Sequence, residues 1–220
     1  MNRRKIIKFS ALVSGLSGLV ILIASVLPII EYQLTDAKSY KTLLSPLVVD
    51  EEKINDKKTS GDFTKASNWF PTDKEIDFGK SKVSFYTVTI PKLKIENAVV
   101  AIGGEDLSKN LVQYPGTALP GKNGNAVIFG HSILPIFYNP KNYVSIFSTL
   151  PTLKEGDEIY INFDGVTYKY QVEELFEIFP SDIQILEQNP SDSFLTLVTC
   201  VPPGDPRNPK RLIVRARVVS

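Results

Sequence analysis

The pattern of hydrophobic and polar positions divides the chain into three stretches. The first is an apolar run from Phe9 to Ile30, which carries no charged residue over 22 positions. At a rise of ~1.5 Å per residue in a helix, such a run is long enough to cross a hydrocarbon core of ~30 Å. We therefore predict one transmembrane helix over residues 9–30.

The residues before this run indicate how the helix is oriented. Arg3, Arg4, Lys5 and Lys8 precede it, and positive charge on the N-terminal flank places that end in the cytoplasm. A cleaved signal peptide is the alternative, but its apolar stretch would be shorter and would end in small residues, a pattern that the run ending at Ile30 lacks. We favour a single-pass anchor in the cell membrane, with residues 1–8 in the cytoplasm and the remainder outside the cell.

The second stretch, residues 31–80, is charged and poorly periodic. It is typical of a stalk or N-terminal appendage that lifts a domain off the membrane. Trp69-Phe70-Pro71 is an exception, because an aromatic pair in a polar stretch usually packs on something. We expect it to pack either on the wall of the domain or in its active-site cleft, where it would act as a lid.

The third stretch, residues 81–220, alternates in short β-branched and aromatic segments separated by turn residues. Asp164-Gly165 between two such segments predicts a hairpin. Residues 105–113 could form a short helix, with Leu107 and Leu111 on one face. About eight short strands with little helix indicate a mainly β fold, a closed or nearly closed barrel.

Composition and charge narrow the class of protein. About 190 residues lie beyond the apolar run, enough for one domain with a full core. The formal net charge is +1, and the basic residues are spread along the chain apart from the membrane flank and the last predicted strand. Neither feature favours a nucleic-acid partner.

The chemistry centres on a single cysteine and a single histidine. Cys200 ends the apolar segment from Leu195, and His131 follows the apolar segment Ala126–Phe129 and Gly130. A thiol is a good nucleophile only as a thiolate, and a histidine can take its proton and later protonate a leaving amine. Taken alone, a free cysteine is more often a buried packing residue. The two together, each at a strand end outside the cell, favour catalysis.

At these residues the chain resembles the sortase family. Thr196-Leu197-Val198-Thr199-Cys200 fits the family's T-L-x-T-C signature, and Arg211 lies eleven positions later at the start of a basic strand. His131 sits in a similar strand-Gly-His segment. The resemblance covers roughly residues 84–219 together with the N-terminal anchor.

The resemblance implies an eight-stranded sortase barrel and a cysteine transpeptidase. Such an enzyme cleaves an L-P-x-T-G-like sorting signal between Thr and Gly, holds a thioester, and passes the protein to an amine on a cell-wall precursor or a pilin lysine. It implies that Cys200 is the nucleophile, His131 the general acid and base, and Arg211 the donor to substrate and oxyanion. Arg207, Arg215 and Arg217 are rivals to Arg211, but only Arg211 lies at the family position.

Further residues are predicted to contact the substrate. Ser132 and Thr199 adjoin the two reactive residues, and ordinary turn or strand chemistry is the alternative role for each. In the family, the loop at residues 180–193 shapes the groove for the signal's Leu-Pro part, which points to Ile185 and Leu186; packing of the loop onto the barrel is the alternative. We predict no metal site and no cofactor, although Glu105 and Asp106 leave calcium open.

Two other interpretations of the sequence remain. A papain-like cysteine protease would hydrolyse the thioester, but its cysteine would lie on a helix. A non-catalytic sortase-like assembly module is the second, and the Cys, His and Arg set argues against it. The expected partners are surface proteins bearing a C-terminal sorting signal, the amine acceptor and the membrane.

Overall fold

The computed structural model describes residues 3–36, 40–42, 64–69, 84–205, 207 and 210–219. They belong to two compact units, Met1–Ser39 and Tyr40–Ser220, and each is described by itself. Most of the predicted stalk at residues 31–80 lies outside the described residues, as do Phe70 and Pro71.

The first unit is one long helix, α1 (Arg3–Glu31), followed by a short π-helical turn, η1 (Tyr32–Asp36). Among the described residues it is the one helix long and apolar enough to span a membrane, over Ile7–Leu34. Its large apolar side chains are exposed, from Phe9 to Ile30. The apolar helix expected over residues 9–30 is therefore confirmed, and it fits a single-pass anchor.

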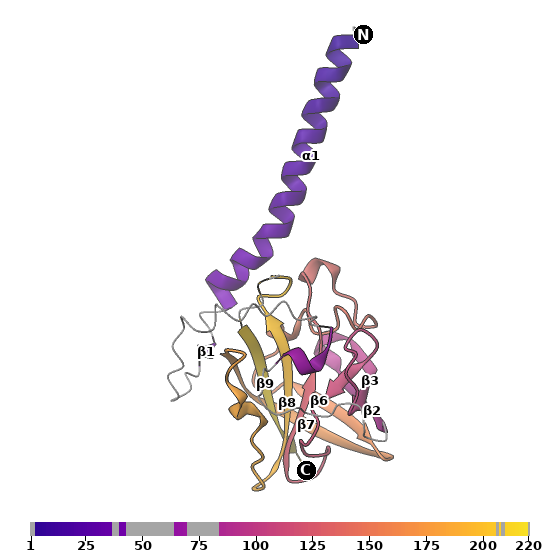
Figure 1. The fold of residues 1–220 in the computed structure, drawn as a ribbon, viewed down its shortest axis with the longest axis vertical. Coiled ribbons are helices and arrows are strands. Elements are labelled where there is room, and N and C mark those ends of the chain that lie inside the picture. Colours follow the sequence, from indigo (N-terminus) through magenta and orange to yellow (C-terminus); the bar gives the residue numbers. More distant parts are fainter. Residues whose placement is uncertain are drawn as a thin grey trace. The chain divides into compact units, whose positions relative to one another are not determined.

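The second unit is a β-barrel (Figure 1). Eight strands close it in the order β7-β6-β2-β3-β4-β5-β8-β9, because β9 pairs with both β8 and β7. A two-residue strand, β1 (Lys41–Thr42), adds in parallel to β7. The eight are β2 (Ser84–Ile90), β3 (Ile95–Ile102), β4 (Leu111–Gln113), β5 (Gly124–Phe129), β6 (Glu158–Phe163), β7 (Val166–Ile178), β8 (Ser193–Val201) and β9 (Lys210–Val219). The predicted eight-stranded barrel is confirmed.

Short-range signals in the sequence explain part of this arrangement. Asp164 and Gly165 join β6 to β7 with φ values of 52° and 76°, the left-handed conformation that a tight hairpin requires. The helix expected over residues 105–113 was wrong. Leu111 instead begins β4, which pairs in parallel with β3 and antiparallel to β5. The four-residue spacing of Leu107 and Leu111 fits a helix, but Leu111 is buried in β4 and Leu107 is buried in the turn before it.

Strand direction brings the predicted reactive residues to one end of the barrel. β5 and β8 are parallel neighbours, with Phe129 opposite Val198, so both strands finish at the same end. The antiparallel β9 begins there, with Arg211 opposite Cys200. In Figure 1 this end lies at the top of the barrel, away from the C-terminus. We call this end of the barrel the catalytic end.

Candidate active site

Cys200 and Arg211 form a cross-strand pair at the catalytic end. They are direct partners in the antiparallel β8–β9 ladder, so their side chains project from the same face of the sheet. Cys200 is only 5% exposed and Arg211 only 1%. Burial raises the pKa of the Cys200 thiol, and the Arg211 guanidinium opposes that rise. Burial likewise lowers the pKa of Arg211, but a guanidinium stays protonated in proteins, so a cation faces the sulfur.

Backbone and hydroxyl contacts tie His131 to the end of β8. The Ser132 hydroxyl donates to the carbonyl oxygen of Cys200 at 2.6 Å, and the Thr199 hydroxyl donates to the carbonyl of Gly130 at 2.8 Å. The Phe147 amide donates to the carbonyl of His131 at 2.9 Å. The Gly130 amide also donates to the carbonyl of Val198 at 3.1 Å, so hydrogen bonds join the segment carrying the histidine to the strand carrying the cysteine. The hydroxyls of Ser132 and Thr199 thus bind backbone carbonyls and position the two segments that carry His131 and Cys200.

Gly130, between β5 and His131, has no room for a side chain. A Cβ at this position would lie 2.4 Å from a ring carbon of Phe147 and 2.6 Å from a methyl of Leu111. The close approach explains why a glycine stands between the apolar strand and the histidine. It also fixes where His131 leaves the sheet.

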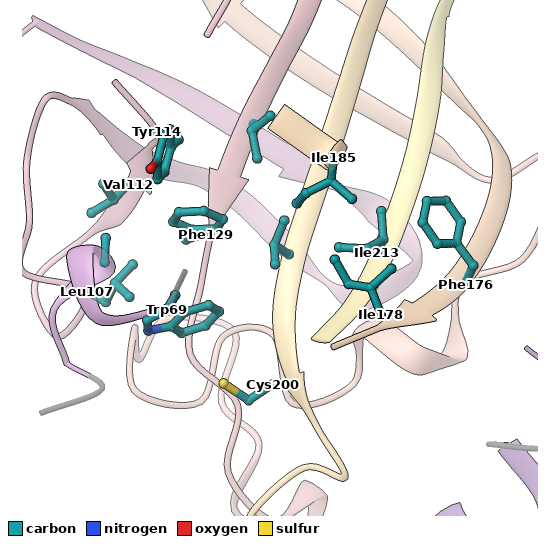
Figure 2. Packing of buried hydrophobic residues seen from close by; sticks show 13 residues of the cluster. Trp69, Leu107, Val112, Tyr114, Phe129, Phe176, Ile178, Ile185, Cys200 and Ile213 are labelled. Atoms are coloured by element: carbon teal, nitrogen blue, oxygen red, sulfur yellow. The ribbon is translucent and has the colours of Figure 1, made fainter. Parts of the chain in front are cut away.

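Trp69 of the N-terminal appendage is fully buried over this site. Its ring centroid lies 5.4 Å from the Arg211 guanidinium carbon and 5.9 Å from the centroid of the His131 ring. The Trp69 carbonyl also accepts a hydrogen bond from Arg211 Nη2 at 3.3 Å. Figure 2 shows the Cys200 sulfur directed towards the Trp69 ring from the end of β8. Trp69 is thus the residue at which the histidine, the arginine and the cysteine converge.

A small β-bridge holds the Trp69 segment on the barrel. Lys65 pairs antiparallel with Asp106 in the β3–β4 connection. The Ala66 amide donates to the Glu105 carbonyl at 3.1 Å, and the Leu107 amide donates to the Thr64 carbonyl at 2.9 Å. The segment from residue 64 to residue 69 is therefore anchored by this pairing and by burial, and Trp69 is its largest buried side chain. It packs over the Cys200 thiol without belonging to the barrel strands.

The other arginines of the C-terminal region are engaged elsewhere. Arg207 makes a bidentate pair with Asp205, with its shortest contact at 2.6 Å. Arg215 pairs with Glu174 at 3.5 Å, and Arg217 pairs with Glu173 at 2.7 Å. At ~3.3 Å per residue, Arg215 and Arg217 lie ~13 and ~20 Å along the strand from Arg211. Of the four arginines, Arg211 is the one opposite Cys200.

A groove continues along the same face of the sheet, away from Cys200. The loop after β7 forms a short 3₁₀ turn, η6 (Ile183–Leu186), which covers this face. Ile185 is buried in a cluster with Phe176 and Ile213, and Leu186 packs against that cluster half-buried (Figure 2). Beyond it lies a cavity of about 370 Å³. The cavity is lined by Asn125, Phe176, Ile178, Asp182, Gln184, Ile185, Glu187, Asn189, Phe194 and Arg215.

Comparison with known proteins identifies the family. The model for the Sortase domain matches residues 88–219, more than half of the 220-residue chain. The chain belongs to the sortase family. The match begins within β2 and ends in β9, so it includes part or all of each of the eight barrel strands.

This sortase is similar to two named Sortase A proteins. It is 26% identical over 132 residues to Sortase A of Streptococcus agalactiae serotype III (strain NEM316), and 30% identical over 136 residues to Sortase A of Bacillus anthracis. Each alignment covers 60% of the chain, but only 51% and 59% of the respective relative. The chain therefore spans little more than half the length of these relatives.

Solved structures agree with the fold of this sortase. A Clostridium perfringens Sortase D5 transpeptidase superimposes with a TM-score of 0.52 at 30% identity, covering 62% of this chain and 79% of the other. Sortase A from Corynebacterium diphtheriae gives a TM-score of 0.54 at 31% identity, covering 64% of this chain and 63% of the other. The similarity spans both A-type and D-type enzymes.

Trp69 packs on the barrel, as the sequence led us to expect of an aromatic residue in a polar stretch. Its ring stacks on Phe129 with 5.5 Å between the centroids, and it also approaches Arg211 and His131. The aromatic character of Trp69 in a polar stretch was the signal, but its contacts with Arg211 and His131 were not predictable from it. Among the described residues, no three His, Cys, Asp or Glu side chains are grouped as metal ligands.

Proposed function

We propose that this sortase is a membrane-anchored cysteine transpeptidase that cleaves a sorting signal of the L-P-x-T-G type and transfers the protein to an amine. One observation carries the proposal: Cys200 lies directly across the β8–β9 ladder from Arg211, and the ring of Trp69 lies against both Arg211 and His131. A nucleophile, an acid–base group and a cationic donor are then gathered on rigid strand ends.

The first half of the reaction forms a thioester. The Cys200 proton passes to His131, and the thiolate attacks the carbonyl carbon of the signal's threonine, so that a C–S bond forms and negative charge develops on the oxygen. Arg211 donates N–H groups to that oxyanion. The intermediate collapses, the Thr–Gly C–N bond breaks, and the His131 imidazolium gives its proton to the glycine nitrogen.

The second half reverses these roles with a new amine. The acceptor's nitrogen attacks the thioester carbon and loses a proton to His131, the C–S bond breaks, and an amide forms. The acceptor is an amine on a cell-wall precursor or a pilin lysine. Surface proteins with a C-terminal sorting signal are the donors. Hydrolysis by water in the second half would make the enzyme a protease instead.

Access to the thiol requires the Trp69 segment to move. Cys200 and Arg211 are both buried in the closed arrangement, and burial favours the neutral thiol. A substrate would have to displace the segment from its bridge to Asp106 and lift the Trp69 ring from its buried position. Once Trp69 leaves, water and substrate reach the sulfur, and Arg211 stabilises the thiolate more than burial opposes it.

The groove next to Cys200 is suited to the apolar half of the signal. Ile185 lines the cavity together with Phe176 and Ile178, and Leu186 packs half-buried against the same apolar cluster. A Leu-Pro pair needs apolar contacts, which these side chains would supply. The helix α1 would hold the enzyme in the cell membrane, with the N-terminus in the cytoplasm and the barrel outside.

A peptide assay tests the proposal against its alternatives. The full chain is mixed with a fluorescence-quenched L-P-x-T-G-type peptide, with and without an amine such as triglycine. Cleavage that yields the amine-linked product supports the transpeptidase. Cleavage to the free acid alone, whatever the amine concentration, would indicate the protease, and no cleavage by a folded chain would indicate a non-catalytic module.

A further inference from the structure

The loop that begins after His131 carries an exposed apolar tip. Ile136 is 67% exposed and Phe137 is 64% exposed, on the short turn η4 (Pro135–Phe137). Scattered single apolar residues are normal on a protein surface, but two large apolar neighbours on one turn form a patch, and such patches mark interaction surfaces. The patch lies five and six positions after His131, at the catalytic end of the barrel.

The tip is held in place by a well-bonded turn. The Phe137 amide donates to the Leu134 carbonyl at 2.9 Å, and the Tyr138 amide donates to the Pro135 carbonyl at 3.0 Å. Leu134 packs tightly on Gly204, where an added Cβ would lie 2.7 Å away. The loop is therefore braced at its base while its two apolar side chains remain outside the core.

Further bonds secure the two sides of the loop. The Ser148 hydroxyl accepts from the Ile133 amide at 2.9 Å, and the Ser145 hydroxyl accepts from the Asn139 amide at 3.1 Å. A loop with this many internal bonds does not need its tip residues for its own folding. Their exposure is a fixed feature of the surface rather than a result of poor packing.

Lysines accompany the patch. The Tyr138 hydroxyl donates to the carbonyl of Leu93, which joins the loop to the β2–β3 turn. Lys94 in that turn and Lys141 in the loop are both exposed, and neither forms an ion pair with the residues that the structure describes. Glu96 is an exposed carboxylate in the same region. Lys92 of the same turn pairs with Asp157 at 2.6 Å, so the remaining two cations and one anion leave the surface around the apolar tip mildly basic.

We propose that Ile136 and Phe137 insert into the lipid surface of the membrane in which α1 is embedded. Apolar side chains flanked by lysines are the chemistry that binds the boundary between acyl chains and anionic headgroups. α1 has the length and composition of a membrane span, so lipid is the apolar partner that the tether would keep close to this loop. The proposal rests on the membrane anchoring given under the proposed function.

The insertion would orient the catalytic end. His131 begins the loop, and the Ser132 hydroxyl donates a hydrogen bond to the Cys200 carbonyl oxygen. Insertion of the loop tip into lipid would therefore turn the candidate active site towards the membrane surface. Substrates that are themselves tethered to lipid would then meet the thiol without a further conformational search. Tip substitutions should therefore affect reactions with membrane-bound substrates and spare those with soluble peptides.

The test uses the full chain in vesicles of phosphatidylcholine and phosphatidylglycerol that contain brominated acyl chains. F137W places a tryptophan on the tip, and V166W is the matched control. Val166 is 49% exposed, and the ladder between β7 and β9 puts it at the opposite end of the barrel from Arg211. Emission of the unsubstituted chain, from Trp69, is subtracted, and vesicle flotation checks that α1 is inserted.

We expect bromine to quench F137W about two-fold more strongly than V166W, as for a side chain that reaches the acyl boundary. K94E together with K141E should weaken the quenching on phosphatidylglycerol vesicles and not on pure phosphatidylcholine. Equal quenching of F137W and V166W in floated vesicles would overturn the proposal. Quenching that appears only when a peptide with an apolar tail is added would indicate a peptide-binding site instead. Quenching that rises with protein density would indicate contact between copies of the chain. Either outcome would also overturn the proposal.

None of these measurements needs catalysis, so their outcome is independent of the peptide assay. A chain that does not float with the vesicles would refute the membrane anchor itself.

Discussion

Cys200 and Arg211 face each other across two antiparallel strands, eleven positions apart in the sequence and directly opposite in the ladder. The antiparallel pairing of β8 with β9 fixes both side chains on one face of the sheet. A cation is thereby held beside the sulfur by the backbone hydrogen bonds of the ladder. The roles assigned to the nucleophile and to its cationic partner depend on this pairing.

The arginine assignment can be tested by substitution. Arg211→Ala should lower kcat/KM for the quenched peptide by ~10²–10³, as is typical when one oxyanion donor is lost. His131→Ala should lower it by orders of magnitude as well. Arg217→Ala is the matched control, since Arg217 lies further along β9, pairs with Glu173 and does not line the cavity. Near-normal activity in Arg211→Ala combined with a large loss in Arg215→Ala would show that the wrong arginine was chosen.

Removal of the Trp69 side chain should expose the thiol. Burial raises the pKa of Cys200, so in Trp69→Ala the pKa should fall, and the rate of alkylation by iodoacetamide should reach its half-maximum at a lower pH. At neutral pH the variant should therefore react faster than the parent chain. Ile159→Ala, a buried change in β6, is the control for general loosening and should leave the midpoint in place. If the pH midpoint of alkylation is the same in Trp69→Ala as in the parent chain, Trp69 does not cover the Cys200 thiol.

The groove wall offers a test at Leu186. From the sequence, serine at either Ile185 or Leu186 is expected to raise KM for the peptide more than it alters thermal stability. Ile185 is nearly fully buried, so its change to serine should also cost on the order of 2–5 kcal/mol of stability. Leu186→Ser is the cleaner variant, because Leu186 is only half-buried. A melting temperature that drops sharply in Leu186→Ser, with KM unchanged, would show that Leu186 packs in the core and does not bind the substrate.

The orientation of the anchor predicts which side of the membrane carries the barrel. The basic flank before the apolar run should keep the N-terminus in the cytoplasm. Protease added to intact cells should then remove the barrel, while a tag placed before residue 3 should survive. Recovery of a soluble secreted form whose N-terminus lies near residue 26 would contradict the retained anchor.

The sequence was informative where structure is local. Apolar runs ending at Gly130 and Cys200 predicted strands that deliver reactive side chains to loops, and Asp164-Gly165 predicted the hairpin that the structure contains. Long-range contacts were not predictable in this way. Residues 105–113 carry helical spacing, yet strand pairing with β3 and β5 places Leu111 in β4.

The position of Trp69 over the candidate active site could not be predicted from the sequence either. Trp69 and Arg211 are separated by 142 positions, and their hydrogen bond depends on a bridge between Lys65 and Asp106. No periodicity within either segment encodes that bridge. The aromatic residue could be noticed in the sequence, but the surface that it covers is defined only by the folded barrel.

The most direct test of the central claim is the intact mass of the enzyme during turnover. The chain is mixed with an L-P-x-T-G-type peptide without amine and quenched in acid. We predict a mass increase equal to the peptide up to its threonine, borne on Cys200, absent from Cys200→Ala and lost on addition of triglycine as the transfer product appears. Peptide cleavage without any acyl adduct, or cleavage that persists in Cys200→Ala, would contradict the assignment of Cys200 as the nucleophile.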